Sequence, residues 1–291
     1  MDLFVLPREE WECASAAHEE RARQWIEPNL QRRSRGEKHP IWDFLFDYYA
    51  VRPTHLYRWH PGLGTALADA SHGPHAQWRD YIEEADGTVH VDATSFVEHR
   101  GKNLAETHAL LTAMKGNRPQ FDCFGLHEWA MVYRTRTPRH DLPLRLGSAG
   151  TDKVVESHTL KCTHFDAYRF FTPPAKPLNL TVLNNDDRPA HDQCACLHAG
   201  MDLFKWAFKA GPLIPGSLLL DCLELAMDIR LLDMEASPYD CRPLGYGVVP
   251  IETAEGKAEY VAKQRAFAER AEPLRHQLVT FYGRALSTVK L

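Results

Sequence analysis

The spacing of apolar residues divides most of the chain into helical segments. Between residues 8 and 35, scattered apolar side chains stand among charged ones, which predicts a long helix that ends at Gly36. The same helical pattern predicts further helices over residues 75–84, 103–115, 198–211, 215–235 and 253–288. Pro273 is expected to interrupt the last of these, because proline lacks the N–H that a helix interior requires.

Two segments carry the alternating or β-rich pattern of strands. Residues 88–97 alternate apolar and polar side chains, and residues 154–171 have a strand-like composition that ends before a group of prolines. Residues 123–134 are apolar enough to be buried but fit either a helix or a strand. The expected fold class is therefore mainly α (α+β), a compact helical domain with a few short strands.

No internal repeat and no long linker divides the chain. Residues 1–291 are expected to form a single domain, and the Pro/Gly/Arg-rich connection 135–152 is the one candidate place for a division into two lobes. The composition, with 44% hydrophobic and 25% charged residues, is that of a globular protein.

Charge and hydropathy exclude several classes of partner. No apolar run approaches the roughly 18 residues of a membrane span, and the N-terminal sequence turns acidic after six residues, unlike a secretory signal. We therefore expect a cytoplasmic protein with no membrane partner. A net charge of −5 argues against non-specific DNA binding, which depends on a basic excess. The sequence leaves the oligomeric state open.

Histidine and cysteine are unusually abundant. The chain contains 16 His and 7 Cys, and the cysteines are expected to be reduced thiols in a cytoplasmic protein. Such residues serve either as buried polar packing or as metal ligands. Three segments concentrate them together with carboxylates: residues 156–166, 194–202 and 221–228.

The first segment places its polar residues at alternate positions. If it is a strand, one face carries Glu156, His158, Cys162, His164 and Asp166. Among them, His164 and Asp166 are candidate metal ligands. The alternative is a half-exposed strand with solvated polar residues and a cysteine in the core.

The second and third segments are helical. His198 and Asp202 are four residues apart, so they project to one side of a helix, as in helical metal sites. Glu224 and Asp228 lie on the following helix, where Arg230 is the one cation, and they are further candidate ligands for the same ion. The alternative is an ordinary solvated helix face.

The expected metal is divalent iron, manganese or zinc, since these ions accept nitrogen and oxygen ligands. A structural zinc site is an alternative that combines Cys162, His164, Cys196 and His198. The sequence contains no C-x-x-C pair, which zinc sites of that type usually use.

Catalytic and substrate-binding candidates surround this expected site. His127 and Glu128 are adjacent in an apolar segment and are candidate acid–base groups, or else buried core residues. An aromatic and basic cluster near the N-terminus would stack a planar substrate, or else forms core with a polar edge. Its substrate-binding candidates are Trp42, Tyr49, Arg58 and Trp59. Motifs for nucleotide-phosphate cradles, H-E-x-x-H zinc sites and nucleophile elbows are absent from the sequence.

Several segments spread over nearly the whole chain resemble one family. They are GEKHPIWDFLFDYY, RPTHLYRWHPGLG, FGLHEWAMVYR, CTHFDAYRFFTPPAKPLN, CLHAGMDLFKWAFKAG and LLDMEASPYD. They are similar to actinobacterial proteins commonly named 3-methyladenine DNA glycosylase. The resemblance implies hydrolysis of an N-glycosidic bond in alkylated DNA.

That activity would need a carboxylate beside an aromatic pocket. Asp240 or Asp233 would stabilise the positively charged sugar, and the aromatic cluster would hold the base. A basic face for DNA would come from Arg32, Arg33, Arg35 and Lys38.

Three functions follow in order of preference. The first is a metal-dependent enzyme that oxidises or hydrolyses a small organic substrate, with His127 and Glu128 assisting. The second is the DNA glycosylase implied by the resemblance, for which DNA is the partner. The third is a non-catalytic ligand-binding protein whose His and Cys residues are core.

Overall fold

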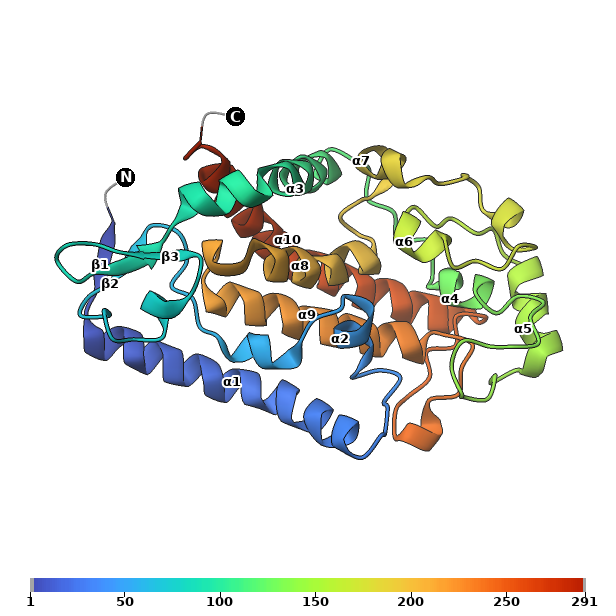
Figure 1. The fold of residues 1–291 in the computed structure, drawn as a ribbon. Helices are drawn as coiled ribbons and strands as arrows, with labels where there is room; N and C mark the ends of the chain where they lie inside the picture. The colour runs from blue at the N-terminus through green and yellow to red at the C-terminus, as the bar shows by residue number, and fades with distance from the viewer. Residues whose placement is uncertain (1–2, 290–291) are drawn as a thin grey trace. The chain divides into compact units, whose positions relative to one another are not determined.

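Helices make up most of residues 3–289, which the computed structural model describes, so the predicted fold class is confirmed (Figure 1). The long helices are α1 (Arg8–Ser34), α3 (Ala93–Met114), α8 (Leu197–Ala210), α9 (Gly216–Glu235) and α10 (Ala254–Leu286). The short helices are α2 (Phe44–Tyr48), α4 (Leu126–Ala130), α5 (Gly147–Glu156), α6 (Phe165–Tyr168) and α7 (Arg188–His191). Single 3-10 turns are η1 (Pro53–Tyr57), η2 (His75–Gln77), η3 (Lys176–Leu178), η4 (Asn185–Asp187), η5 (Gly211–Leu213) and η6 (Arg242–Leu244). Among the helices of the described chain, none is both long and apolar enough to cross a membrane.

The chain divides into two compact units. Unit 1 consists of Met1–Ala109, Leu203–Glu224 and Leu274–Leu291. Unit 2 consists of Leu110–Asp202 and Leu225–Pro273. The chain passes from one unit to the other within α3, α8, α9 and α10. Residues 135–152, the candidate place for a division, lie inside unit 2, and the single-domain prediction stays a prediction.

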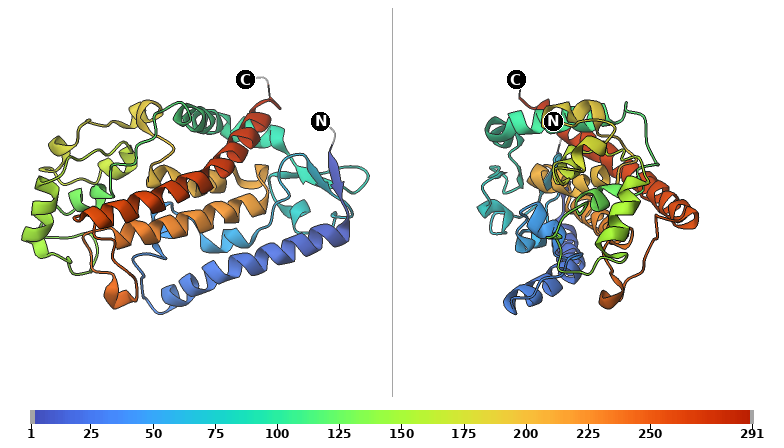
Figure 2. Two further views of the ribbon diagram at one scale, coloured as in Figure 1. Left: turned by 180° about the vertical axis from the view of Figure 1, so that it is seen from behind. Right: turned by 90° about the vertical axis from the view of Figure 1, so that its right-hand side faces the viewer.

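Unit 1 contains a small sheet beside the N-terminal end of α1 (Figures 1 and 2). Its strands are β1 (Phe4–Leu6), β2 (Thr65–Leu67), β3 (Tyr81–Glu83) and β4 (Val89–Val91), in the order β1-β2-β4-β3. β1 pairs with β2 in parallel, and the other two pairs are antiparallel. Trp11 from α1 and Trp59 pack with β-strand residues Leu67 and Val89 in a hydrophobic cluster, which fixes the helix to the sheet.

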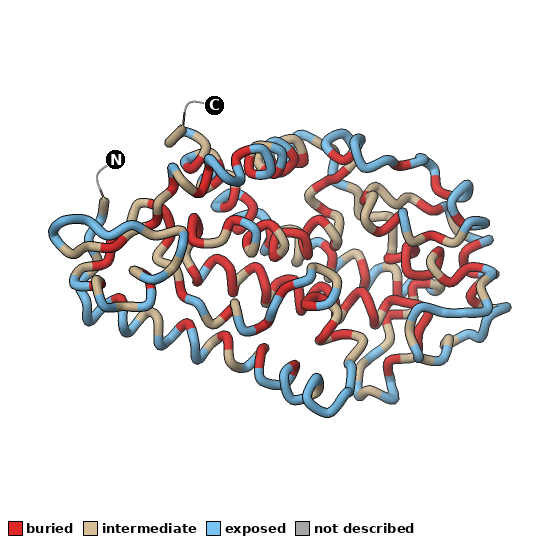
Figure 3. The backbone as a smooth tube through the Cα atoms, in the orientation of Figure 1, coloured by how far each residue is buried: buried red, intermediate tan, exposed pale blue. Residues whose placement is uncertain are grey.

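Helix α1 buries one face and exposes the other (Figure 3). Its buried residues Trp11, His18, Ala22, Ile26 and Asn29 recur at intervals of three, four or seven, as an amphipathic helix requires. The Trp11 indole donates a hydrogen bond to the carbonyl of Ala68 at 2.9 Å. His18 Nε2 lies 2.8 Å from the carbonyl oxygen of Leu56 in η1, so the helix is tied to the loop beside it.

Unit 2 is built from short helices around parts of α8, α9 and α10. Trp129 of α4 is fully buried, and its indole donates a hydrogen bond to the carbonyl of Ala236 just beyond α9. Gly125 precedes α4 with a φ of +67°, a conformation that L side chains rarely adopt. A Cβ at this position would also lie 3.2 Å from the ring of Tyr260, so the glycine allows α4 to approach α10.

Two sequence-based strand and helix predictions are wrong. Residues 154–171 form the end of α5, an irregular segment and α6 rather than a strand. Local bonding explains the difference, since His158 Nδ1 bonds the carbonyl of Val154 and competes with strand pairing. Residues 75–84 form η2 and β3 rather than a helix, because the chain turns at Trp78 into the sheet.

Other segment boundaries differ less. The segment 88–97 is a strand only as far as Val91, and α3 begins at Ala93, ten residues earlier than predicted. The ambiguous segment 123–134 contains the helix α4. Pro273 does not interrupt α10, which continues through it.

Candidate metal centre

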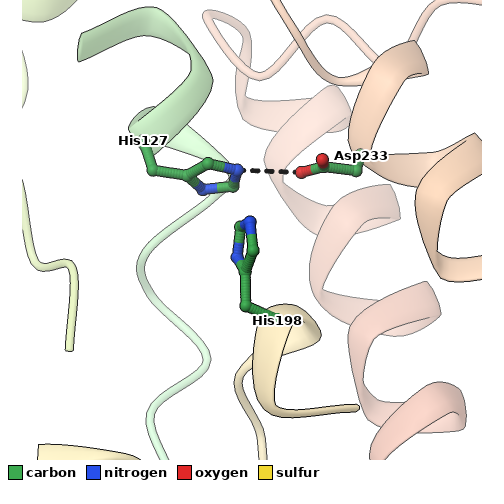
Figure 4. A group of neighbouring side chains, drawn as sticks. All are labelled: His127, His198 and Asp233. Atoms are coloured by element: carbon green, nitrogen blue, oxygen red, sulfur yellow. Dashed lines mark hydrogen bonds and ion pairs between the residues drawn. The ribbon is translucent and has the colours of Figure 1, made fainter. Parts of the chain in front are cut away.

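Three residues that are far apart in the sequence meet inside unit 2 (Figure 4). They are His127 of α4, His198 of α8 and Asp233 of α9, and their possible ligand atoms all lie within 4.8 Å of one another. His127 Nε2 lies 2.9 Å from Asp233 Oδ1, and the two imidazole rings meet edge to face at 4.3 Å between centroids. A metal with nitrogen and oxygen ligands near 2 Å separates neighbouring ligand atoms by about 3–4 Å, so this group fits one ion after small side-chain movements.

Glycines allow the helices that carry these residues to approach closely. His127 is the second residue of α4, directly after the Gly125 turn described above. His198 is the second residue of α8, and Gly200 follows it. A Cβ at Gly200 would lie 2.8 Å from the side chain of Ile229, so α8 and α9 are in direct backbone-to-side-chain contact here. The sequence thus brings the imidazoles next to Asp233, one turn further along α9.

A second group of ligand-type residues lies next to the first. His164 at the start of α6, Asp166 within α6 and Asp202 of α8 also have possible ligand atoms within 4.8 Å of one another. His164 Nε2 is 3.6 Å from Asp202 Oδ2. The His164 ring stacks on that of His198, at 5.5 Å and 19° between planes, so the two groups share one wall.

Two buried arginines hold the carboxylates in place. Arg230 Nη1 donates to Glu128 Oε1 at 3.0 Å and to Asp233 Oδ2 at 2.6 Å, which leaves Asp233 Oδ1 directed at His127. Arg188 Nη2 lies 2.9 Å from Asp202 Oδ2. These charged hydrogen bonds fix the orientation of the carboxylates, as residues that contact metal ligands do in known metal sites.

Arg188 also pairs with Asp192, the carboxylate that holds the other nitrogen of His164. Arg188 Nη2 is 2.8 Å from Asp192 Oδ2, and His164 Nδ1 is 3.1 Å from Asp192 Oδ1. A histidine that donates one ring nitrogen to a carboxylate presents the other as a lone pair, which is the usual arrangement of a metal-binding imidazole. The nitrogen left for a ligand is Nε2, the atom that faces Asp202.

Negative charge exceeds positive charge within this buried region. Its carboxylates are Glu128, Asp166, Asp192, Asp202 and Asp233, and its buried guanidinium groups are those of Arg188 and Arg230. Asp166 also pairs with the exposed Arg169, so five carboxylates and three guanidinium groups leave two negative charges with neutral imidazoles, and one when His127 is protonated. All of these carboxylates except Asp166 are buried, and charges in a poorly solvated interior must be compensated by protons or cations.

The surroundings shift the pKa of His127 and that of His198 in opposite directions. Burial lowers the pKa of His127, but the charge and hydrogen bond of Asp233 outweigh it, so the pKa is raised. Burial and the neighbouring His127 together hold the pKa of His198 well below its ordinary value. Burial alone would raise the pKa of Asp233, but His127 and Arg230 lower it by more, so the net shift is downward. His198 is therefore a neutral imidazole with a free lone pair, as a metal ligand must be.

A small cavity adjoins His127 and His198. Its volume of about 20 Å³ holds one water-sized molecule, and its walls include Tyr260 and the thiols of Cys123, Cys162 and Cys196. Burial raises the pKa of all three thiols, to about 12 for Cys162. Neither ligand group contains a cysteine, so the structure gives no support to the zinc site expected from Cys162, Cys196 and the two histidines.

Four of the six predicted metal ligands lie in the two groups: His164, Asp166, His198 and Asp202. The other two do not. Asp228 pairs with Arg270 of α10 and lies outside both groups. Glu224 pairs with Arg21 of α1, with Nη2 2.6 Å from Oε2. Both acids pair with cations from other helices, which a pattern read along one helix does not contain.

The predicted catalytic residues are placed in different ways. His127 belongs to the first ligand group, and Glu128 is buried against Arg230. Asp240 lies outside both groups, where the hydrogen bond of Arg242 lowers its pKa to about 2.

The predicted substrate-binding residues belong to unit 1. Trp42 packs against Trp25, and Tyr49 meets Phe204 edge to face. Trp59 is buried in the core of the sheet. Arg58 lines a cavity of unit 1.

The sequence did not single out Asp192, Arg188 or Arg230 as part of the site. Arg188 and Asp192 are four residues apart and Arg230 and Asp233 are three apart, which are helical ion-pair spacings. That spacing was the available signal.

Comparisons with protein families, with curated proteins and with solved structures find no match to this chain.

Proposed function

We propose that unit 2 is a metal-dependent enzyme that acts on a small organic substrate. The observation that carries this proposal is the convergence of His127, His198 and Asp233 in one buried group. Two imidazoles and one carboxylate are the donor set of mononuclear iron(II) oxygenases and of several zinc hydrolases. The second group, with one imidazole and two carboxylates, would hold a further divalent ion or carry protons for the first.

The bound metal would supply either activated oxygen for an oxidation or activated water for a hydrolysis. The chain's own groups have separate tasks in both cases. Arg230 holds Asp233 Oδ2 so that Oδ1 remains directed at the site. The neighbouring cavity admits one water-sized molecule beside His127 and His198.

Charge supports a cation at this place. With neutral imidazoles the region carries two negative charges beyond its guanidinium groups, and a divalent ion would neutralise them. Binding would also displace the proton of His127, because a ligand imidazole must be neutral.

Metal content is the test of this proposal. The purified protein, as isolated and after reconstitution with Fe²⁺, Mn²⁺ or Zn²⁺, is expected to hold at least one ion per chain by elemental analysis. His198→Ala and Asp233→Asn should each lower the content to below about 0.2 per chain. Asp228→Asn is the matched control, since it removes a carboxylate of the same helix that pairs with Arg270 instead. Equal metal content in all three variants, or no binding by the wild type, would refute the proposal.

N-glycosidic hydrolysis is the second candidate function, and it is favoured by one local observation. Two hydrogen bonds from Arg242 lower the pKa of Asp240 to about 2 and orient its carboxylate, which would have to leave Arg242 in order to stabilise a positive sugar. The basic face expected for DNA is weaker than the sequence indicated, because Arg32 pairs with Asp43 and Arg33 with Asp47. Release of 3-methyladenine from alkylated DNA by metal-free protein, lost in Asp240→Asn, would establish this activity. A protein with neither metal nor glycosylase activity would favour the third function, that of a non-catalytic ligand-binding protein.

A further inference from the structure

Unit 1 contains a cavity that the metal centre does not explain. Its volume is about 470 Å³, which lies within the range of small-molecule sites. Residues on its walls come from η1 and the segment after it, from the stretch between η2 and β3, and from α3, α8, η5 and α9. All of them belong to unit 1, so the cavity is a property of that unit alone.

Three arginines converge on this cavity with one acid. Arg58, Arg79 and Arg100 line it, and Asp80 is the one carboxylate among the lining residues. Within residues 3–289, none of the three guanidinium groups forms an ion pair. Burial lowers the pKa of His60, another wall residue, to about 3, so it adds no charge. The walls therefore carry two net positive charges.

Aromatic rings form another part of the cavity wall. The Arg58 guanidinium lies 5.6 Å from the centroid of the Trp78 ring. Trp78 meets His60 edge to face at 5.1 Å, and His60 stacks on Tyr81 and bonds its hydroxyl at 2.8 Å. These contacts hold Trp78 in a fixed orientation at the cavity, and a fixed indole is a platform on which a planar ring can stack.

We propose that this cavity binds an organic phosphate monoester that carries a planar ring, of the nucleoside 5′-monophosphate class. A phosphate monoester carries close to two negative charges at neutral pH, which matches the net charge of the walls. One arginine guanidinium can donate two parallel hydrogen bonds to a phosphate, and three guanidinium groups line the cavity. The volume greatly exceeds that of a phosphate ion, and the Trp78 platform accounts for the remaining space with a stacked ring.

This inference does not rest on the proposed metal-dependent activity, because its residues lie in unit 1 and the ligand groups lie in unit 2. Either proposal can fail while the other stands. The probes are chosen accordingly, and all measurements use the full chain in the presence of a chelator.

The test is isothermal titration calorimetry with AMP, adenosine and inorganic phosphate. AMP is expected to bind at least tenfold more tightly than adenosine or phosphate, because only AMP uses both the arginines and the indole. Arg79→Gln and Arg100→Gln should each weaken AMP binding about 10- to 100-fold, the effect of one charged hydrogen bond. Trp78→Leu should weaken AMP binding about 5- to 100-fold and leave phosphate binding unchanged. Arg52→Gln, an exposed arginine nearby that does not line the cavity, is the matched control and should change binding less than twofold.

Three results would overturn the proposal. These are no binding of AMP, equal affinities for AMP and phosphate, and equal losses in Arg79→Gln and Arg52→Gln. A single-stranded oligonucleotide that binds more tightly than AMP would also overturn it, in favour of a nucleic-acid surface. Trp78 packs against His75 and its replacement can affect folding, whereas Arg79 and Arg100 are exposed, so the arginine variants keep the test decisive. Arg79→Lys, which keeps the charge but not the paired donors, should retain an intermediate affinity.

Discussion

Replacing Arg230 by methionine tests the charge network that supports the candidate metal centre. Arg230 is 1% exposed, and one of its nitrogens contacts both Glu128 at 3.0 Å and Asp233 at 2.6 Å. At an effective dielectric constant of about 20, each contact corresponds to roughly 5–6 kcal/mol of Coulomb energy. Relief of the arginine's own desolvation offsets part of this, and breaking buried pairs by removing one partner costs about 3–5 kcal/mol. We expect that loss in the free energy of unfolding.

The assay is urea unfolding of chelator-treated protein at pH 7, followed by circular dichroism and tryptophan fluorescence with coincident curves. Arg270→Met is the control, because it removes an arginine from a pair with Asp228 in which both side chains are nearly half exposed. Exposed pairs contribute at most about 1 kcal/mol. Adding Glu128→Gln to Arg230→Met should recover about 1–2 kcal/mol, since it removes a buried unpaired charge. If Arg230→Met and Arg270→Met differ by less than about 1 kcal/mol, the buried network does not hold the site together.

Three further predictions concern the backbone, pH and thiols. Gly125→Ala should lower the free energy of unfolding by about 1–3 kcal/mol, because of its φ of +67° and its contact with Tyr260. Gly36→Ala is the control: its φ is +70° but nothing lies within 4 Å, so its loss should be no more than about 1 kcal/mol. Equal losses in the two variants would contradict the close approach of Gly125 to Tyr260. Burial lowers the pKa of His60 to about 3 in the folded protein. Below pH 6.5 the unfolded chain therefore binds a proton at His60 that the folded protein does not bind, and the free energy of unfolding falls as pH decreases from 6.5 toward 3. His60→Gln removes this contribution, and its stability difference from the wild type should be more favourable to the variant at pH 5 than at pH 7; a constant difference would refute the assignment. Ellman's reagent should modify the exposed Cys13 rapidly in the native protein and the buried Cys222 and Cys241 only on unfolding; rapid reaction of all seven thiols would contradict the burial.

The sequence predicted the long helices well because their signals are local. The helices α1, α8 and α9 agree with the predicted segments within a residue or two at each end. The apolar spacing lies within each helix and the Pro or Gly residues lie close to its ends, so both signals are local in the sequence. The strand prediction for residues 154–171 was wrong because the β-branched and aromatic composition reflects burial rather than strand pairing. The backbone there follows local hydrogen bonds.

The candidate site was predicted in part for a similar reason. His198 and Asp202 share one helix, so their common side follows from the sequence, and both lie in the ligand groups. The pairing of His127 with Asp233 spans 106 residues and depends on how α4 packs against α9, which no local pattern contains. The acids at 224 and 228 failed for the converse reason, because arginines of α1 and α10 neutralise them from a distance along the chain.

Anomalous X-ray scattering from crystals grown with Mn²⁺ or Zn²⁺ tests the central claim most directly. We expect a peak about 2.0–2.3 Å from the imidazole nitrogens of His127 and His198 and from an oxygen of Asp233, and we expect this peak to be lost in His198→Ala crystals. A second peak among His164, Asp166 and Asp202 would extend the site to two ions. Fully metal-loaded crystals with no peak at either group, or with peaks only at surface carboxylates, would contradict it.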